Sequence, residues 1–223
     1  MLSVSEADFG IAAVTRACAA LPAPLPPQYY FWNPPEIKPS SLVVPIVEVD
    51  GEAALILTKR ASQMRNHAGD WVFPGGRIDP DLDIDSRAGA LRELQEELGP
   101  DPSHVTLIGA LDSRGPILSG HVIDVFVGVI DAAALIKPDP TEVSDVAVVP
   151  LREFATVGSD YTSQNLPGSD RAATMPSSRP GPIEMHFFNF GDDQLVWGTQ
   201  GEIIWDLLSC VLGDRPTIAQ IRS

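Results

Sequence analysis

The stretch 92–99, which reads Arg-Glu-Leu-Gln-Glu-Glu-Leu-Gly, predicts a short helix with two chemically different faces. Leucines in and just before it recur at helical spacing and form an apolar stripe for packing. Glu93, Glu96 and Glu97 stand at i, i+3 and i+4, so their side chains share another face. Like charges at these spacings destabilise a helix by about 0.2–0.5 kcal/mol per pair, so a positive partner is expected. Cations that take oxygen ligands, such as Mg²⁺ or Mn²⁺, suit three carboxylates.

Taken alone, three such glutamates more often form a solvated acidic surface, and the neighbouring sequence decides between the two interpretations. A glycine pair at 75–76 allows backbone carbonyl groups to approach an ion closely. Gly99 is typical of the residue that follows the end of a helix. Arg92 can hold one of the carboxylates in position through a charge-assisted hydrogen bond. These neighbours favour a cation site.

The glycine pair and the acidic helix together resemble the box of the Nudix hydrolases. That pattern is a glycine, a spacer with an acidic residue, and then R-E-U-x-E-E-x-G-U, where U is aliphatic. Gly76 supplies the glycine and 92–99 supplies the rest, except that Pro100 replaces the closing aliphatic residue. The spacer is longer than usual and carries four aspartates instead of a glutamate: Asp79, Asp81, Asp83 and Asp85. Of these, we expect Asp83 to have the supporting role.

The segment 57–76 is similar to a narrower signature, L-T-x-R-[SA]-x-x-x-R-x-x-x-G-x-x-x-F-P-G-G, which marks the coenzyme A diphosphatase branch of the Nudix family. Every fixed position of that signature is met. Three further short motifs resemble this branch: Asp79-Pro80, Ala90-Leu91 and Trp197-Gly198-Thr199. In the last of them the threonine comes one position early. The resemblance covers roughly residues 41–212.

This resemblance implies hydrolysis of the pyrophosphate bond of coenzyme A or acyl-coenzyme A, giving 3′,5′-ADP and 4′-phosphopantetheine. Two alternatives stay open. Trp71 and Val72 stand where the branch commonly has an aliphatic and then a small residue, which leaves room for ADP-ribose, a dinucleotide or a nucleotide sugar as the substrate. The other alternative is a non-catalytic nucleotide-binding domain, against which the intact set of three glutamates argues.

The resemblance also implies site residues. The expected metal ligands are Gly76, Glu93, Glu96, Glu97 and Glu142, and the expected catalytic residues are Glu93, Glu96, Glu97 and Arg92. Glu93 could instead orient the attacking water. Glu142, which lies outside the box, could be a ligand, the general base or a surface acid. Two or more ions would neutralise a pyrophosphate and lower the pKa of a bound water.

Cations upstream of the glycine pair are candidates for binding a phosphorylated substrate. The expected substrate-binding residues are Arg60, Arg65, His67 and Phe73. Guanidinium groups pair with phosphate oxygens in two-pronged fashion. The alternatives are that the arginines are surface charges or partners of local acids, and that His67 is a structural hydrogen-bonding group.

Composition limits the partners. A formal net charge of −15 in 223 residues argues against nucleic acid and anionic membranes, and favours a small-molecule nucleotide handled with the help of metals. No apolar run reaches the roughly 20 residues that a membrane span needs. Cys18 and Cys210 are far apart in the sequence and lack metal-binding spacing, so a reduced, cytoplasmic location is expected.

The order of predicted elements indicates an α/β fold, which the resemblance specifies as a Nudix-type α/β/α sandwich around a mixed sheet. The expected strands are 42–49, 53–59, 105–111, 121–130, 145–150 and 183–190, and the expected helices are 85–98 and 198–212. We expect a Nudix domain over 41–215, with a flexible loop at about 158–182 that could be a lid or a tether, and a tail over 216–223.

An extension over 1–40 precedes this domain. Its first part, 1–21, predicts an amphipathic helix capped by Ser5. The following part is rich in proline and aromatic residues, which suggests an irregular segment that packs onto another surface. That surface could belong to a second copy of the chain in a homodimer or to the domain's own flank.

Overall fold

A computed structural model describes residues 7–26, 36–63, 68–115, 120–157, 186–192 and 194–213 of the chain. The helices are α1 (Ile11–Ala19), α2 (Ser86–Leu98), α3 (Leu151–Val157) and α4 (Thr199–Val211), with a 3₁₀ turn at Pro102–His104. The strands are β1 (Lys38–Val49), β2 (Glu52–Arg60), β3 (Trp71–Val72), β4 (Gly75–Arg77), β5 (Val105–Arg114), β6 (His121–Ile130), β7 (Val143–Pro150), β8 (Phe187–Phe190) and β9 (Gln194–Trp197).

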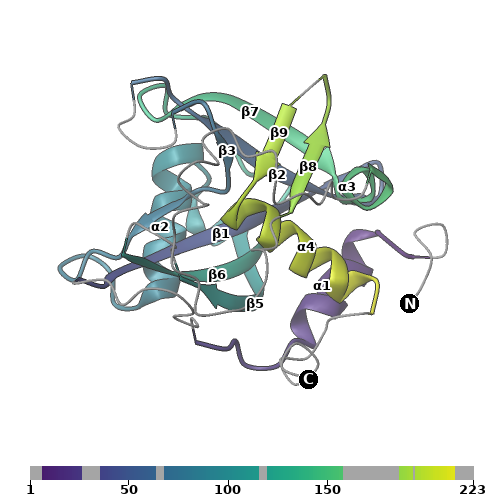
Figure 1. Cartoon of the computed structure of the whole chain (residues 1–223), viewed down its shortest axis with the longest axis horizontal. Helices are drawn as coiled ribbons and strands as arrows, with labels where there is room; N and C mark the ends of the chain where they lie inside the picture. The colour runs from purple at the N-terminus through teal and green to yellow at the C-terminus, as the bar shows by residue number, and fades with distance from the viewer. Residues whose placement is uncertain are drawn as a thin grey trace, which may run out of the picture.

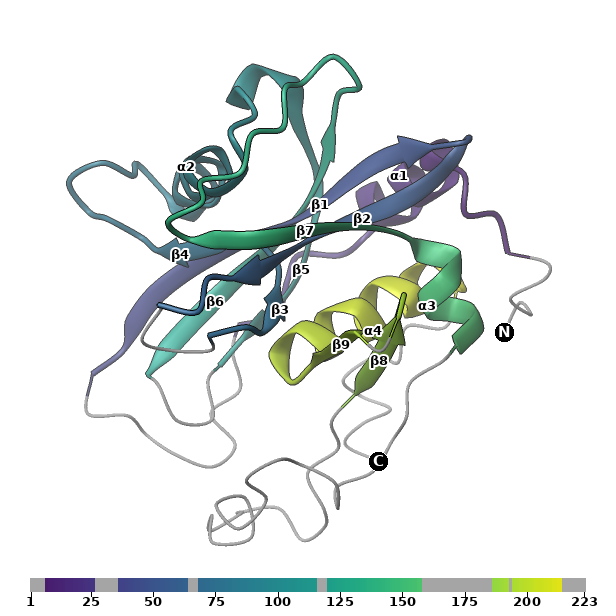
Figure 2. The ribbon, with the colours of Figure 1, turned by 90° about the horizontal axis from the view of Figure 1, so that it is seen from above.

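These elements form three layers around a mixed sheet of seven strands (Figures 1 and 2). Helix α2 covers one face of the sheet, whereas α1, α3 and α4 lie on the other, together with the β8–β9 hairpin. The predicted α/β/α sandwich is therefore confirmed. Within the described ranges, no helix combines the length and the apolar character that crossing a membrane requires.

Strand β1 is the centre of the sheet and contacts three other strands. Its second half pairs with β2 in antiparallel register, and its first half pairs with β4, where Ser40 lies opposite Arg77. On its other side it runs parallel to β6, with Lys38 opposite His121. Because side chains alternate between the two faces of a strand, this register decides which residues of β1, β4 and β6 share a face.

Local sequence explains the bounds of α2. The side chain of Asp85 accepts a hydrogen bond from the backbone N–H of Ala88 and caps the first turn. Gly99 ends the helix in the left-handed region, at φ 83°, where glycine carries no steric cost. Leu94 and Leu98 are fully buried in an apolar cluster that includes residues from β1, β2 and β6. Burial of each leucine stabilises this layer by about 1.5–3 kcal/mol.

The first helix differs from the prediction for 1–21. It begins at Ile11 after Gly10, which makes no side-chain cap, and Ser5 lies outside the described residues. Phe9 lies before the helix and is buried, and its carbonyl accepts a hydrogen bond from the backbone N–H of Ala53 at the start of β2. The residues before Ile11 therefore do not continue the helix. Burying the Phe9 ring in the core stabilises the fold more than one further helical turn would.

Candidate active site

The glycine pair of β4 lies between β1 and α2, and close contacts surround both residues. A Cβ atom on Gly75 would lie 2.4 Å from Cβ of Leu42, and one on Gly76 would lie 2.4 Å from Cδ of Glu93. Real Cβ atoms do not approach other atoms so closely. Only glycine therefore allows the β4 backbone to lie directly against the Glu93 carboxylate.

Glu97 is the most buried carboxylate of α2, with only 3% of its surface exposed. The backbone N–H of Gly75 donates a hydrogen bond to its Oε1 at 3.2 Å. The pKa of Glu97 is raised to about 7, mainly by burial. The Gly75 hydrogen bond and the charge of Arg60 oppose this rise, whereas the charges of Glu142 and Glu93 contribute to it. A nearby cation would favour the ionised form of this side chain.

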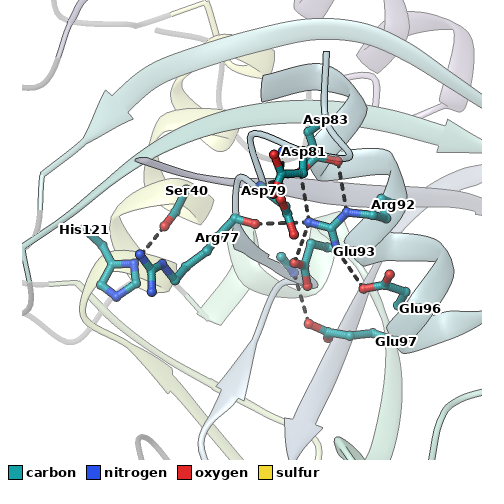
Figure 3. Close-up of polar contacts among 11 residues, drawn as sticks. Ser40, Arg77, Asp79, Asp81, Asp83, Arg92, Glu93, Glu96, Glu97 and His121 are labelled. Carbon is teal, nitrogen blue, oxygen red and sulfur yellow. Dashed lines mark hydrogen bonds and ion pairs between the residues drawn. The ribbon is translucent and has the colours of Figure 1, made fainter. Parts of the chain in front are cut away.

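Arg92 organises the opposite side of the acidic surface (Figure 3). Its Nε lies 2.9 Å from Oδ1 of Asp83, Nη1 lies 2.8 Å from Oε2 of Glu96, and Nη2 lies 3.0 Å from Oε1 of Glu93. Nη2 also donates to the backbone carbonyl of Arg77 at 3.1 Å. One guanidinium group thus links α2, β4 and the spacer loop.

Asp83 is the spacer acid that contacts Arg92. Its side chain is 1% exposed, and the hydrogen bond from Arg92 lowers its pKa more than burial raises it. Oδ2 of Asp83 also accepts a hydrogen bond from the backbone N–H of Asp79, with an N···O distance of 2.8 Å. Among the other spacer acids, Asp85 caps α2 and the Asp79 side chain accepts a hydrogen bond from the Asp81 N–H. Asp83 is the spacer acid that helps to position Arg92.

The predicted acidic residues take different positions around α2. The Glu96 side chain is 53% exposed, and the Glu93 side chain is 17% exposed. Glu142 is exposed, yet its charge raises the pKa of both Glu93 and Glu97, although burial is the main cause for each. The loop that carries Glu142 is fixed to the end of α2, because the Asp139 N–H donates to the Glu97 carbonyl at 2.9 Å.

The chemistry of these donors fits a hard divalent cation. Carboxylate oxygens and a glycine carbonyl are its preferred ligands, and the glycine at position 76 leaves the space for close approach. Among the residues that the structure describes, no three acidic, histidine or cysteine side chains already converge as a metal cluster. Arg92 instead binds the carboxylates of Glu93 and Glu96.

The other side of the glycine pair borders a cavity of about 440 Å³. Arg60 lines it and Phe73 contributes to its wall, but the Phe73 side chain is only 2% exposed and packs in the core. Two of the predicted substrate-binding residues, Arg65 and His67, lie outside the described residues. Sequence reasoning did not single out several other polar residues of the lining: Ser40, Asp70, Arg77, His121 and Gln200.

This arrangement of sheet, glycine pair and acidic helix belongs to a known family. The sequence model of the NUDIX domain matches residues 38–166, from the start of β1 to beyond α3. The chain is therefore a member of the Nudix family, and it is a pyrophosphohydrolase, as this family membership implies. Nudix hydrolases generally depend on divalent metals.

Relatives of similar length share this assignment. A Nudix hydrolase named NudL from Cronobacter sakazakii, described as uncharacterized, is 31% identical over 179 residues, which are 80% of this chain and 85% of the relative. NudL of Escherichia coli strain K12, also described as uncharacterized, is 30% identical over the same shares. Among solved structures, the NUDIX domain of Shewanella oneidensis NrtR complexed with ADP ribose has a TM-score of 0.45 and 19% identity, covering 56% of this chain and 82% of that one.

Proposed function

We propose that this enzyme hydrolyses the pyrophosphate bond of coenzyme A or acyl-coenzyme A, with Mg²⁺ or Mn²⁺ as its cofactor, and releases 3′,5′-ADP and 4′-phosphopantetheine. The signature over 57–76 supports this choice of substrate, and family membership supports the type of bond. The observation that carries the proposal is the position of the glycine pair between the acidic helix and the cavity. On one side the pair contacts Glu93 and Glu97, and on the other side it lines the cavity.

The acidic residues would hold the cation next to the pyrophosphate. When bound, Mg²⁺ or Mn²⁺ would neutralise phosphate charge and lower the pKa of a water molecule. Glu97, Glu93 and Glu96 are the proposed ligands from α2, joined by the Gly76 carbonyl. Arg92 would keep Glu93 and Glu96 in place, because it contacts both carboxylates.

The water that attacks phosphorus needs a proton acceptor. Glu142 and Glu93 are the two candidates, since both lie close enough to Glu97 to raise its pKa. Glu142 is the more exposed of the two, so it could pass a proton to solvent. Glu142 could serve instead as a further metal ligand. No covalent intermediate is needed, because displacement by water yields two phosphate monoesters directly.

The cavity would receive the substrate. Arg60 lines it, and the charge of Arg60 lowers the pKa of Glu97. Arg60 is therefore positioned to bind the phosphates while the acidic residues hold the metal. Arg65 and His67 remain proposed substrate-binding residues on the strength of the sequence signature. Phe73 is proposed to shape the cavity wall, since its backbone N–H donates to Oε1 of Gln200 at 3.1 Å.

A substrate panel tests the proposal. Purified enzyme with Mg²⁺ or Mn²⁺ is given coenzyme A, acetyl-coenzyme A, ADP-ribose, a dinucleoside polyphosphate and a nucleotide sugar, and the products are separated by chromatography. We expect coenzyme A or its thioester to have the highest kcat/KM and to yield 3′,5′-ADP. The Glu97→Gln variant should lose nearly all turnover while it remains folded. Preferred hydrolysis of another compound would overturn the substrate assignment, and an active Glu97→Gln variant would overturn the site.

A Nudix hydrolase of ADP-ribose, a dinucleotide or a nucleotide sugar is the second candidate, and one observation favours it. Trp71, which departs from the residue type common in the coenzyme A branch, lines the cavity. Its indole N–H donates to Oε1 of Gln194 at 2.8 Å, so the ring is held firmly in the wall. Because the Trp71 side chain is only 5% exposed, it would set the shape of the cavity wall beside a sugar or base rather than offer a face for stacking.

A further inference from the structure

We infer that Arg77 and His121, with the charge of Lys38 nearby, form a second anion-binding subsite in this cavity, which takes a phosphate monoester on the ribose of the substrate. The inference rests on the proposed function, because it assumes that the pyrophosphate lies at the neighbouring glycine pair. It concerns a group that does not react, and therefore selectivity among substrates rather than bond cleavage.

The register of three strands brings these side chains to one face of the sheet. Ser40 of β1 lies opposite Arg77 of β4, and Lys38 of β1 lies opposite His121 of β6. Residues 38, 40 and 42 of β1 point to the same side, since side chains alternate along a strand. Leu42 belongs to the core on the α4 side, so this common face is the cavity side of the sheet.

One direct contact, a shared cavity lining and charge interactions connect these residues. Oγ of Ser40 lies 2.7 Å from Nδ1 of His121, and Ser40, Arg77 and His121 all line the cavity. Figure 3 shows the Arg77 side chain beside the His121 ring. Burial lowers the pKa of His121, and the charges of Lys38 and Arg77 lower it further. Three basic groups therefore lie close enough for the charges of two of them to act on the third.

This concentration of positive charge is unusual in a chain with a net charge of −15. Among the described residues, no carboxylate forms an ion pair with Lys38 or Arg77, whereas Arg92, Arg114 and Arg152 all have acidic partners. A neighbouring carboxylate would raise the pKa of His121, but the causes that act on it are burial and the charges of Lys38 and Arg77, which all lower it. A bound dianion would compensate these charges and favour the protonated form of His121.

The position of the cluster suits a ribose phosphate. Arg77 directly follows the glycine pair, and two residues of extended chain, about 7 Å, separate it from Gly75. A ribose that bears phosphates on its 3′ and 5′ positions spans a distance of this order. Coenzyme A carries such a 3′-phosphate, whereas ADP-ribose does not. The subsite thus selects among the candidate substrates.

The test compares coenzyme A with 3′-dephospho-coenzyme A, which differ only in this phosphate. We expect wild-type enzyme to have a higher kcat/KM for coenzyme A, mainly through a lower KM. In Arg77→Gln and His121→Asn this ratio of specificities should fall about tenfold, the effect of losing about 1.4 kcal/mol of binding. Arg16→Gln, which removes the same charge from an exposed position on α1, should keep the wild-type ratio.

The outcomes separate the subsite from the proposed function. Equal kcat/KM for both compounds in the wild type, or an unchanged ratio in Arg77→Gln and His121→Asn, would overturn the subsite and leave the proposed function standing. If neither compound is hydrolysed, the proposed function fails, and calorimetric titration with 3′,5′-ADP and 5′-AMP, which differ only in the 3′-phosphate, decides the subsite. Tighter binding of 3′,5′-ADP that Arg77→Gln abolishes would support it, and equal binding of both nucleotides would overturn it.

Discussion

Replacing Glu97 by glutamine should make the metal-free protein more stable and the enzyme inactive. The glutamine keeps the size of the side chain and can still accept the Gly75 hydrogen bond, but it removes a buried charge. Burial raises the pKa of Glu97 from its usual 4.5 to about 7. At about 1.4 kcal/mol per pKa unit, the ionised form costs the folded state on the order of 3 kcal/mol.

The dependence on pH follows from the sign of this shift. Below about pH 4.5 the carboxyl group is protonated in both the folded and the unfolded chain, so it imposes no cost. Between pH 4.5 and 7 the unfolded chain releases the proton while the folded chain keeps it, and stability is progressively lost. Above pH 7 the full cost applies. The gain in Glu97→Gln should therefore be small at pH 4.5 and complete at pH 8.

Thermal denaturation in the presence of a chelator measures this gain. For a chain of this size, about 3 kcal/mol corresponds to a rise in Tm of about 6–12 °C at pH 8. Glu48→Gln, which removes an exposed carboxylate at the end of β1, is the matched control and should show no such rise. Added Mg²⁺ or Mn²⁺ should raise the Tm of the wild-type chain and have little effect on Glu97→Gln, because binding to the folded state stabilises it. A Glu97→Gln variant that is no more stable than the wild type at pH 8 would refute this reasoning.

Three further substitutions test the surroundings of the site. Gly76→Ala should lower kcat/KM at least tenfold in an assay that measures product formation, because the alanine Cβ would collide with the Glu93 carboxylate. Asp83→Asn should reduce kcat and cost about 1–2 kcal/mol in urea denaturation, since Arg92 loses a buried partner but stays partly solvated; retention of full activity would show that Arg92 needs no such support. Leu94→Ala should cost about 2–5 kcal/mol in the same denaturation experiment, because the side chain is fully buried.

Local periodicity was sufficient to predict the long elements of the fold. The strand expected over 121–130 has these bounds, and α2 begins only one residue after the expected position. Strands β3 and β4 were not predicted, because two or three residues carry no detectable alternation. They exist through pairing: β4 pairs with β1, and β3 pairs with the end of β2, so each depends on a partner strand outside its own local sequence. Helix α3 and strand β9 were missed as well, and both are short.

The burial of Glu97 shows why the site could be predicted only in part. Its spacing places it on the acidic face with Glu93 and Glu96, which suggests exposure to solvent. In the folded chain the Asp139 N–H donates to the Glu97 carbonyl, and β4 covers the Glu97 side chain. Both partners come from elsewhere in the sequence, so no local pattern reveals them. The raised pKa is therefore a property of the tertiary structure.

Strand β4 explains how such an acidic protein can bind a polyanion. Because side chains alternate along a strand, Gly76 faces the carboxylates of α2, whereas Gly75 and Arg77 face the cavity. Only a single layer of backbone separates the negative and the positive surfaces. The acidic side suits metal ions and the basic side suits phosphate groups, and at each glycine the lack of a side chain brings the two surfaces closer together. An added side chain at either glycine would weaken this coupling even if all charged residues were kept.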